Sequence, residues 1–257
     1  MPIITLISDF GIHDPAAGAL KGILLGSLPA AQIIDISHEV PPFDRRQAAY
    51  LLDSAYRHFP AGTIHLVCVD IYADHMPRLV AAYYDGQFFL APDNGIIPMA
   101  FPNATIDAWL CFELSNTYTF YDWQLAAAQE IRRLSQSQGS GTPKHQLINF
   151  LHHIQQVQPG IFACSVIYID QYGNVVTDMT LATFEALNRS GRFMLTFMRV
   201  NEITAISKHY SDVTSGESLC RFNSSGHLEI CVNQGNAAVL FGFRSGGIHN
   251  DIKITFG

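Results

Sequence analysis

The chain has 257 residues, of which 48% are hydrophobic and 14% are charged, so a sizeable core in one large domain or two ordinary ones is expected. The formal net charge of -7 offers no basic field for a phosphate backbone, which argues against nucleic acid as a partner. No apolar run approaches the roughly 20 residues that span a membrane, so we expect no membrane association.

The cysteines and the N-terminus both indicate a cytoplasmic protein. The 5 cysteines are widely spaced and never form a CxxC pair, a distribution typical of reduced core thiols rather than of a disulfide framework or a zinc site. The first ten residues lack a basic segment and reach an acid at Asp9, which is too early for a secretory signal peptide. We therefore expect no metal and no secretion.

The first part of the chain alternates short β-branched runs with segments of helical period, which predicts a mostly parallel sheet flanked by helices. Asp14 and Pro15 have the pattern of a helix N-cap followed by proline at the first helical position. Asp85 and Gly86 mark a hairpin turn. The expected elements are, in order, strand 3–8, helix 16–25, strand 33–36, helix 45–58, strand 64–69, hairpin strands 78–84 and 87–91, and helix 123–134.

The composition changes at residues 135–144, where a polar, glycine-containing stretch without periodicity predicts a surface connector. One more helix is predicted at 145–156. The later runs are short and alternating, which indicates a small all-β barrel or sandwich. Its expected strands are 165–169, 193–200, 218–222, 228–232, 237–241 and 252–256. We thus predict an α/β domain over residues 1–160 and an all-β domain over residues 161–257.

Four apolar runs end in a carboxylate, at Asp9, Asp70, Asp93 and Asp170. In open α/β sheets ligands bind beyond the carboxyl ends of the strands, and a carboxylate there can accept hydrogen bonds from a ribose diol. Aspartate is also a common turn residue, which explains any one of these alone; the set together favours a site. Because the chain has neither a GxxxxGK loop nor GxGxxG after the first strand, we expect a ligand without phosphate.

Four segments resemble the S-adenosylmethionine hydroxide adenosyltransferase family, which is related to fluorinase and chlorinase. They are ITLISDFG at 4–11, IIDISHEVPPFD at 33–44, FFLAPDNG at 88–95 and YIDQYGNVVT at 168–177. NSSGHLEICVN at 223–233 is a fifth and looser match. The matches follow the family's order and span nearly the whole chain, and chance co-occurrence of SHEVPPFD and DQYGN is improbable.

The resemblance implies an α/β domain, a C-terminal β-barrel, and a homotrimer whose sites lie between the N-domain of one subunit and the C-domain of the next. It also implies S-adenosylmethionine as substrate, with water, hydroxide or a halide attacking the ribose C5′. Because methionine leaves as a neutral thioether, the reaction requires orientation and a desolvated nucleophile rather than a general acid, a metal or another cofactor.

The family's binding residues carry over onto named positions. Asp9 is expected to accept hydrogen bonds from the ribose hydroxyls, and Phe43 to pack against the sugar and base. Asp14 and Asp170 are expected to face the methionine ammonium. Tyr172 stands where the family usually has phenylalanine and could stack on adenine. The remaining substrate-binding candidates are Asp93 and Asn94 of the FFLAPDNG match, Asn174 at the base edge, and Ser224 and Ser225 at the methionine carboxylate.

The chain departs from the family where water is activated. In the hydrolytic members of the family that this chain resembles, three residues are associated with activation of the water. They are an Asp that opens a DPGVG loop, an Arg that follows this loop, and a His in a segment of the type FHGRD. Here Asp70 remains, the glycines are absent, Arg78 falls near the family's arginine, and Tyr121 replaces the histidine. A tyrosine with an ordinary pKa near 10 is a poor base at neutral pH.

Three alternatives follow from this departure. The predicted function is hydrolysis of S-adenosylmethionine to adenosine and methionine, with Asp70 and Arg78 in the site and His75 supplying an imidazole. A surface-loop histidine is also commonly just solvated. In the second alternative the nucleophile is a halide. In the third, the chain binds S-adenosylmethionine or adenosine without turnover, because loss of one triad member can abolish catalysis and leave the pocket intact.

Overall fold

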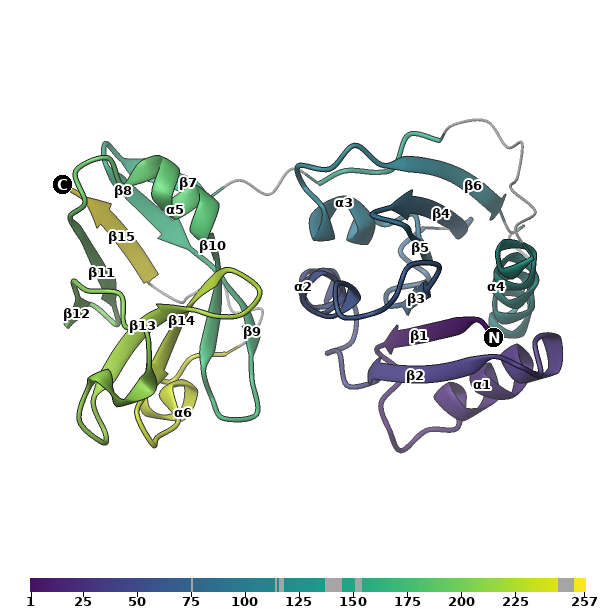
Figure 1. Cartoon of the computed structure of the whole chain (residues 1–257), viewed down its shortest axis with the longest axis horizontal. Coiled ribbons are helices and arrows are strands. Elements are labelled where there is room, and N and C mark those ends of the chain that lie inside the picture. The colour runs from purple at the N-terminus through teal and green to yellow at the C-terminus, as the bar shows by residue number, and fades with distance from the viewer. Residues whose placement is uncertain (75, 114, 116–117, 137–144, 151–153, 245–251) are drawn as a thin grey trace. The chain divides into compact units, whose positions relative to one another are not determined.

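A computed structural model describes residues 1–74, 76–113, 115, 118–136, 145–150, 154–244 and 252–257. The chain divides into two compact units, Met1–Leu151 and His152–Gly257, which are coloured from purple to teal and from green to yellow in Figure 1. Within the described ranges, no helix combines the length and the hydropathy that a membrane crossing requires. All five cysteines are free, and four of them are buried.

The first unit is built on a six-stranded sheet with the strand order β2-β1-β3-β5-β4-β6. The strands β1 (Ile3–Ser8), β2 (Gln32–Ser37), β3 (Ile64–Cys68) and β5 (Gln87–Pro92) pair in parallel. Strand β4 (Arg78–Tyr84) runs the opposite way and pairs antiparallel with both β5 and β6 (Asp107–Glu113). The predicted hairpin turns at Asp85 and Gly86, with φ values of 49° and 76°. The predicted mostly parallel sheet is thus a mixed sheet: the predicted hairpin makes β4 antiparallel to β5, and β6, which was not predicted, pairs with β4 at that edge.

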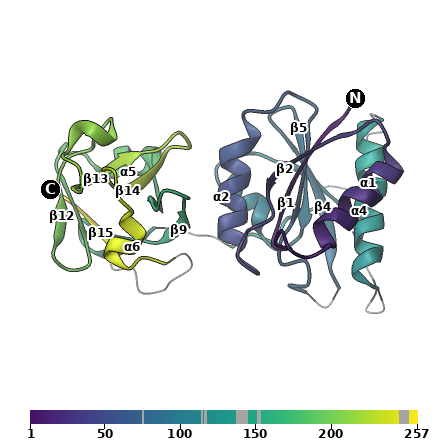
Figure 2. The same cartoon turned by 90° about the horizontal axis from the view of Figure 1, so that it is seen from below.

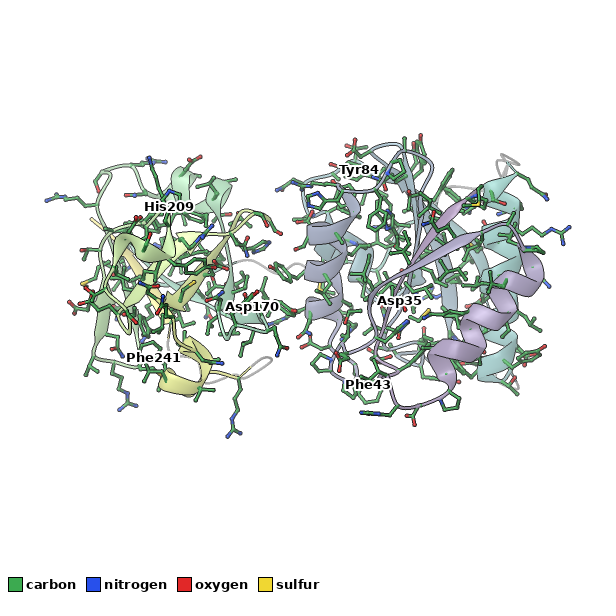
Figure 3. The ribbon with its side chains drawn as sticks, turned by 60° about the horizontal axis from the view of Figure 1, so that its bottom comes forward. Asp35, Phe43, Tyr84, Asp170, His209 and Phe241 are labelled. Atoms are coloured by element: carbon green, nitrogen blue, oxygen red, sulfur yellow. The ribbon has the colours of Figure 1, made fainter. Side chains whose placement is uncertain are left out.

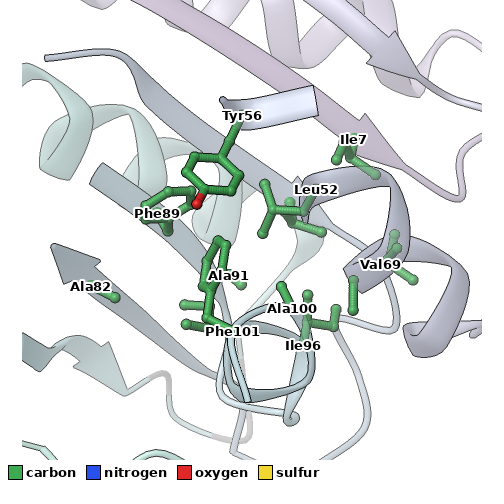
Figure 4. Packing of buried hydrophobic residues seen from close by; sticks show 14 of the residues in the cluster. Ile7, Leu52, Tyr56, Val69, Ala82, Phe89, Ala91, Ile96, Ala100 and Phe101 are labelled. Carbon is green, nitrogen blue, oxygen red and sulfur yellow. The ribbon is translucent and has the colours of Figure 1, made fainter. Parts of the chain in front are cut away.

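Helices cover both faces of this sheet. Helices α1 (Ala16–Ser27) and α4 (Phe120–Ser135) pack on one face, and α2 (Arg45–Tyr56) and the short α3 (Ile96–Ala100) pack on the other (Figure 2). The core under α2 is aromatic: the Phe101 ring lies 5.1 Å from Tyr56 and 4.8 Å from Phe89 (Figure 4). Buried rings of this size contribute much of the hydrophobic stabilisation of a domain.

Local caps fix where two of these helices begin. The Asp44 carboxylate accepts a hydrogen bond from the Gln47 backbone N–H at 3.0 Å, and Thr119 and Asp122 form a reciprocal capping box at the start of α4. The predicted cap at Asp14 is wrong, because α1 begins after Pro15 and no side chain caps it. Asp14 is instead an exposed residue of the loop between β1 and α1.

One histidine is completely enclosed in the first sheet. His65 lies on β3 with no exposed surface; its Nδ1 is 2.7 Å from Thr5 Oγ1 and its Nε2 is 2.7 Å from Gln87 Oε1. Because the amide oxygen of Gln87 only accepts, Nε2 carries the proton and Nδ1 accepts from threonine. Burial lowers the His65 pKa to about 4, so the imidazole is neutral at physiological pH.

The second unit contains two antiparallel sheets with the strand orders β13-β14-β10-β9 and β12-β11-β15-β8-β7. Their strands are β7 (Gln155–Gln158), β8 (Ile161–Cys164), β9 (Val166–Ile169), β10 (Val175–Thr180), β11 (Phe193–Phe197), β12 (Asn201–Ile203), β13 (Ser218–Phe222), β14 (His227–Val232) and β15 (Ile252–Phe256). Helices α5 (Leu181–Leu187) and α6 (Ala237–Phe241) and the 3-10 turn η1 (Tyr210–Asp212) accompany them. Among the described residues these strands form separate sheets rather than one closed barrel.

Two sequence predictions for this part of the chain are wrong. Residues 145–150 are irregular rather than helical, and β7 occupies residues that the predicted helix would have covered. The segment predicted as a strand at 237–241 is the helix α6. Its start is fixed by the Asn236 side chain, which accepts from the Val239 N–H at 2.8 Å, and its end by Gly242 with a φ of 70°.

Candidate active site

A cleft of about 410 Å³ opens at the carboxyl edge of the first sheet. Such a volume lies within the range of pockets for small ligands. Three loops shape it, after β1, after β3 and before α2, together with the start of α4. Its lining is formed by two carboxylates among aromatic and aliphatic side chains: Asp9, Phe10, Pro42, Phe43, Asp70, Ile71, Tyr72 and Phe120.

Asp9 is the hub of this cleft. Its Oδ2 accepts a hydrogen bond from the Phe43 N–H at 3.1 Å and another from the Asp70 N–H at 3.2 Å. Both donors belong to residues in the left-handed region, with φ of 67° at Phe43 and 52° at Asp70. Such conformations cost free energy in residues with a side chain and persist where the surroundings hold them. Among the described residues none donates to the other oxygen, Asp9 Oδ1.

Phe43 is held at the rim of the cleft rather than in the core. Its side chain is 69% exposed (Figure 3), although phenylalanine is normally buried. The strained backbone of Phe43 is thus stabilised by Asp9 on one side and by the start of α2 on the other, where Asp44 is the N-cap. An exposed ring fixed beside a carboxylate provides a flat apolar surface for a ligand.

Besides Asp9, two side chains position Asp70. The Asn94 side-chain amide, which follows β5, donates to the carbonyl oxygens of Val69 and Asp70, each at 3.0 Å. Arg45, the first residue of α2, brings Nε within 3.4 Å of Asp70 Oδ2. Burial raises the pKa of the Asp70 carboxyl, Arg45 lowers it, and Asp9 raises it further. Asn94 is therefore a backbone brace beneath the cleft rather than part of its lining.

Asp93 and Arg78 lie in a separate cluster beside this one. The Asp93 side chain is 2% exposed; its Oδ2 is 2.7 Å from His145 Nε2 and its Oδ1 accepts from the Ile148 N–H at 2.9 Å. Arg78 Nη2 is 3.9 Å from Asp93 Oδ2 and 3.5 Å from Asp74 Oδ2. Among the described residues the ion-pair partner of Asp70 is thus Arg45, and the partners of Arg78 are Asp74 and Asp93.

The sequence pattern predicts a helix at His145 and does not indicate its pairing with Asp93. His145 is separated from Asp93 by 52 residues, and no local pattern reports such a pair. For two other residues considered in the sequence analysis, the structure provides no contact in the cleft. His75 lies outside the described residues. Tyr121, at the position of the family's histidine, is 57% exposed in the first turn of α4 and does not line the cleft.

Aromatic side chains form much of the cleft wall. The Phe10 and Phe120 rings meet edge to face at 5.3 Å, and Tyr72 stacks on Tyr118 at 5.9 Å. Aromatic walls exclude water and stack well on planar ligands. A second hollow of about 350 Å³, lined by residues of β6 and α4 such as Cys111 and Glu130, contains none of the predicted site residues.

The second unit brings Asp170, Tyr172 and Asn174 into one turn between β9 and β10. Asp170 Oδ1 accepts from the Tyr172 and Asn174 N–H groups at 2.9 and 2.8 Å. Its Oδ2 accepts from the Asn174 side-chain amide at 2.8 Å. Tyr172 projects with 79% of its surface exposed, whereas Asn174 is 4% exposed. Asn174 Nδ2 also donates to the Tyr210 hydroxyl at 3.2 Å, so this amide is already engaged within the unit.

Gly173 fixes the same turn against α6. It has a φ of 83°, and a Cβ there would lie 2.1 Å from the Asn236 side chain, so only glycine fits. Its carbonyl oxygen accepts from the Ala238 N–H at 2.9 Å. The turn and the helix therefore form one rigid corner on which the exposed Tyr172 ring stands.

Ser224 and Ser225 occupy a different turn, between β13 and β14. The register pairs Val175 of β10 with Ile230 and Thr180 with His227, so this turn lies beyond one end of β10 while the Asp170 turn lies beyond the other. The Asn223 side chain accepts from the Ser225 N–H at 3.0 Å. Within this unit the two serines and the Asp170 turn do not converge on one point.

Models of two protein families match the chain. The SAM hydroxide adenosyltransferase N-terminal domain matches residues 4–137, and the SAM hydroxide adenosyltransferase C-terminal domain matches residues 164–248. The first match includes Asp9, Phe43 and Asp70 of the cleft. The second includes the turns that contain Asp170 and Ser224.

Curated relatives and solved structures extend these matches over the whole chain. The chain is 28% identical to (R)-S-adenosyl-L-methionine hydrolase of Salinispora tropica, covering 100% of this chain and 98% of that protein. It is 21% identical to a fluorinase of an Actinoplanes species over 95% of both proteins. The crystal structure of an uncharacterized conserved protein from Thermotoga maritima superposes over 100% of both chains with a TM-score of 0.76 and 24% identity, which shows a shared fold.

Proposed function

The chain belongs to the SAM hydroxide adenosyltransferase family, and we propose that it hydrolyses S-adenosylmethionine to adenosine and methionine. The single observation that carries this proposal is the Asp9 hub. One carboxylate holds both a rim aromatic, Phe43, and a second carboxylate, Asp70, in strained conformations around one cleft. The names of the curated relatives give the substrate and the reaction.

The cleft residues suit an adenosyl group. Asp9 Oδ1, which lacks a donor among the described residues, accepts a ribose hydroxyl. The exposed Phe43 ring packs on the sugar and base, and the aromatic wall excludes bulk water. None of the described residues that line the cleft is a cation, and the neighbouring Arg45 is paired with Asp70, which supports a ligand without phosphate.

The reaction needs little more than orientation and one proton acceptor. The water oxygen forms a bond to C5′ while the bond from C5′ to sulfur breaks, and the sulfonium keeps that electron pair as neutral methionine thioether. The proton of the attacking water passes to the Asp70 carboxylate and then to solvent. No general acid and no cofactor take part, because the leaving group is neutral.

The remaining sequence candidates complete the proposal. Asp14 and Asp170 are the candidates for the methionine ammonium. Ser224 and Ser225, the candidates for its carboxylate, lie beyond the opposite end of β10 from Asp170, so within one unit these serines and Asp170 do not bind the same methionine. Tyr172 stacks on adenine, and Asn174 reaches the base edge with its amide oxygen, because its nitrogen is engaged. We further propose a homotrimer. Sedimentation equilibrium should give three times the chain mass, and a monomer that turns over would contradict the trimer.

A second candidate is binding without turnover. The observation that favours it is Tyr121, which stands exposed where the family's histidine is expected and has no place in the cleft. Under this alternative the Asp9 hub still binds adenosine, but the water is never activated. A halide nucleophile is a further alternative with no specific support in the cleft.

One experiment separates these functions. Purified protein is incubated with S-adenosylmethionine, with and without chloride or fluoride, and the products are separated by chromatography while calorimetry measures adenosine binding. Adenosine formation that falls at least about hundredfold in Asp70→Asn supports hydrolysis. Saturable binding with no product favours the binding protein, a halo-adenosine favours halide, and neither binding nor product overturns the adenosyl site.

Two variants test the other proposed water-activating residues. If His75 supplies the imidazole, His75→Gln lowers turnover about hundredfold and leaves adenosine binding intact. If Arg78 acts directly on the water, Arg78→Gln has a similar effect. A variant with unchanged turnover removes that residue from the mechanism and leaves Asp70 as the proton acceptor.

A further inference from the structure

Arg45 has three simultaneous contacts at the edge of the cleft. Its Nε is 3.4 Å from Asp70 Oδ2, and its Nη1 donates to the Asn94 carbonyl oxygen at 3.0 Å. The guanidinium carbon lies 4.8 Å from the centroid of the Phe150 ring. A planar guanidinium that is stacked on one side and hydrogen-bonded along its edge has few other orientations.

Arg45 also violates a local rule of helix design. It is the first residue of α2, where the positive end of the helix dipole disfavours cations; the acid at this end is the N-cap Asp44, and the first turn itself contains none. Its neighbour Arg46 is exposed, and none of the described residues pairs with it. An unfavourable position that is nevertheless tied by three contacts indicates a functional use of the side chain.

The stacking partner of Arg45 is itself anchored. Phe150 follows two residues of the same stretch, His145 and Ile148, that both bind the buried Asp93 carboxylate. Gly95, with a φ of 91°, allows the ring to approach, because a Cβ there would lie 2.5 Å from Phe150 Cδ2. The 145–150 segment therefore holds Phe150 over the start of α2.

We propose that Arg45 is the positioning residue that orients the Asp70 carboxylate in the cleft, and that Phe150 and the Asn94 carbonyl fix Arg45 for this purpose. The inference deepens the proposed function, on which the role of Asp70 as proton acceptor rests. Arg45 thereby takes the role beside Asp70 that the family resemblance predicts for Arg78, whose ion pairs among the described residues are with Asp74 and Asp93.

The charges around Asp70 give this assignment a pH signature. Among the described residues, Asp9, after β1, and Arg45, on α2, are the charged groups that act on Asp70. Asp93, after β5, is paired with His145 and lies near Arg78. Burial and Asp9 raise the Asp70 pKa, and Arg45 lowers it. Of the influences that the described residues exert on the Asp70 pKa, removal of Arg45 leaves those that raise it, so the acidic limb of the pH–rate profile moves to higher pH.

The variants are Arg45→Gln, Arg45→Lys and Phe150→Leu, with Arg46→Gln as the matched control from the same helical turn. Arg45→Gln is expected to lower kcat/KM about tenfold near neutral pH, with a larger loss in mildly acidic buffer. Arg45→Lys restores the position of the acidic limb, because it keeps the charge. Phe150→Leu lowers kcat about threefold without moving the limb, and Arg46→Gln stays within about twofold of the parent.

A second measurement makes the inference independent of turnover. The Asp70 carboxyl carbon is titrated by NMR in labelled protein, assigned by its disappearance in Asp70→Asn, after circular dichroism has shown each variant to be folded. An upward shift of the Asp70 titration in Arg45→Gln, absent in Arg46→Gln, supports the inference even in a chain without hydrolase activity. Equal titrations in the two variants overturn it, whereas a parent without product overturns only the proposed hydrolysis.

Discussion

Asp9 in the first unit and Asp170 in the second each follow directly after a strand. Their carboxylates nevertheless differ in which parts of the chain they bind. Asp9 holds two strained residues from distant segments with one oxygen, and the described residues offer no donor to the other. Asp170 binds two N–H groups and one side-chain amide of its own turn, spread over both oxygens. The first carboxylate organises a cleft, and the second organises its own loop.

This difference provides a criterion for ranking aspartates in similar sequence contexts as candidates for ligand binding. A buried or half-buried carboxylate whose bonding capacity is filled locally mainly stabilises the fold, whereas one with spare capacity beside a cleft is available to a ligand. By this criterion Asp9 and Asp70 are stronger site candidates than Asp170. The contribution of the second unit then rests more on the exposed Tyr172 ring than on its carboxylate.

The largest effect is expected for Asp9→Ala. The change removes the proposed ribose acceptor and releases the Phe43 and Asp70 N–H groups, so adenosine affinity should fall about hundredfold or more. Isothermal titration calorimetry measures the affinity. Asp53→Ala, which removes an acid of α2 that pairs with Arg57, should change it by less than about twofold; equal losses in both variants would refute the special position of Asp9.

His65 extends the comparison to a polar side chain of the first sheet whose hydrogen-bond partners, Thr5 and Gln87, both lie inside the fold. Its pKa is lowered from 6.5 to about 4, so the unfolded state binds a proton that the folded state does not. Stability should therefore decrease as pH falls from 6.5 towards about 4, by roughly 3 kcal/mol in total. Denaturant unfolding at several pH values measures how steeply the free energy of unfolding changes with pH. This slope should be smaller in His65→Gln and unchanged in the exposed control His58→Gln.

Asp170→Ala tests the other side of the comparison. Loss of three hydrogen bonds in a partly exposed turn should destabilise the second unit by about 2 kcal/mol, since water replaces part of them. Chemical denaturation followed through signals of the second unit gives the value. If unfolding is unaffected while adenosine or methionine binding is lost, Asp170 belongs with Asp9 and the ranking is wrong.

The smallest effect is expected for Phe43→Gly. Glycine adopts the left-handed backbone without strain, so the folded protein should gain about 1 kcal/mol, while loss of the exposed ring should weaken adenosine binding about tenfold. Thermal unfolding and calorimetry provide the two numbers. Phe43→Ala keeps the strain and loses the ring, so a stabilised alanine variant would contradict the account of φ at this residue.

Local patterns were sufficient for most of the first unit. Alternation and helical period located β1 to β3, α1, α2 and the β4–β5 hairpin, because each element buries one face and the turn at Asp85 and Gly86 uses residues suited to positive φ. Patterns failed at residues 237–241, where an apolar run reads as a strand. There the Asn236 cap and Gly242 favour a helix, and the cap was the signal that could have corrected the prediction.

The sequence by itself determined the family, through motifs such as SHEVPPFD and DQYGN, and it identified carboxylates at strand ends as site candidates. Only the tertiary structure decided which of them act together. Asp9 meets Phe43 and Asp70 across 34 and 61 residues of chain, and Arg45 rather than Arg78 faces Asp70. Such pairings depend on strand order and on loops that cross the sheet edge, whereas sequence periodicity reports only which face of an element is buried.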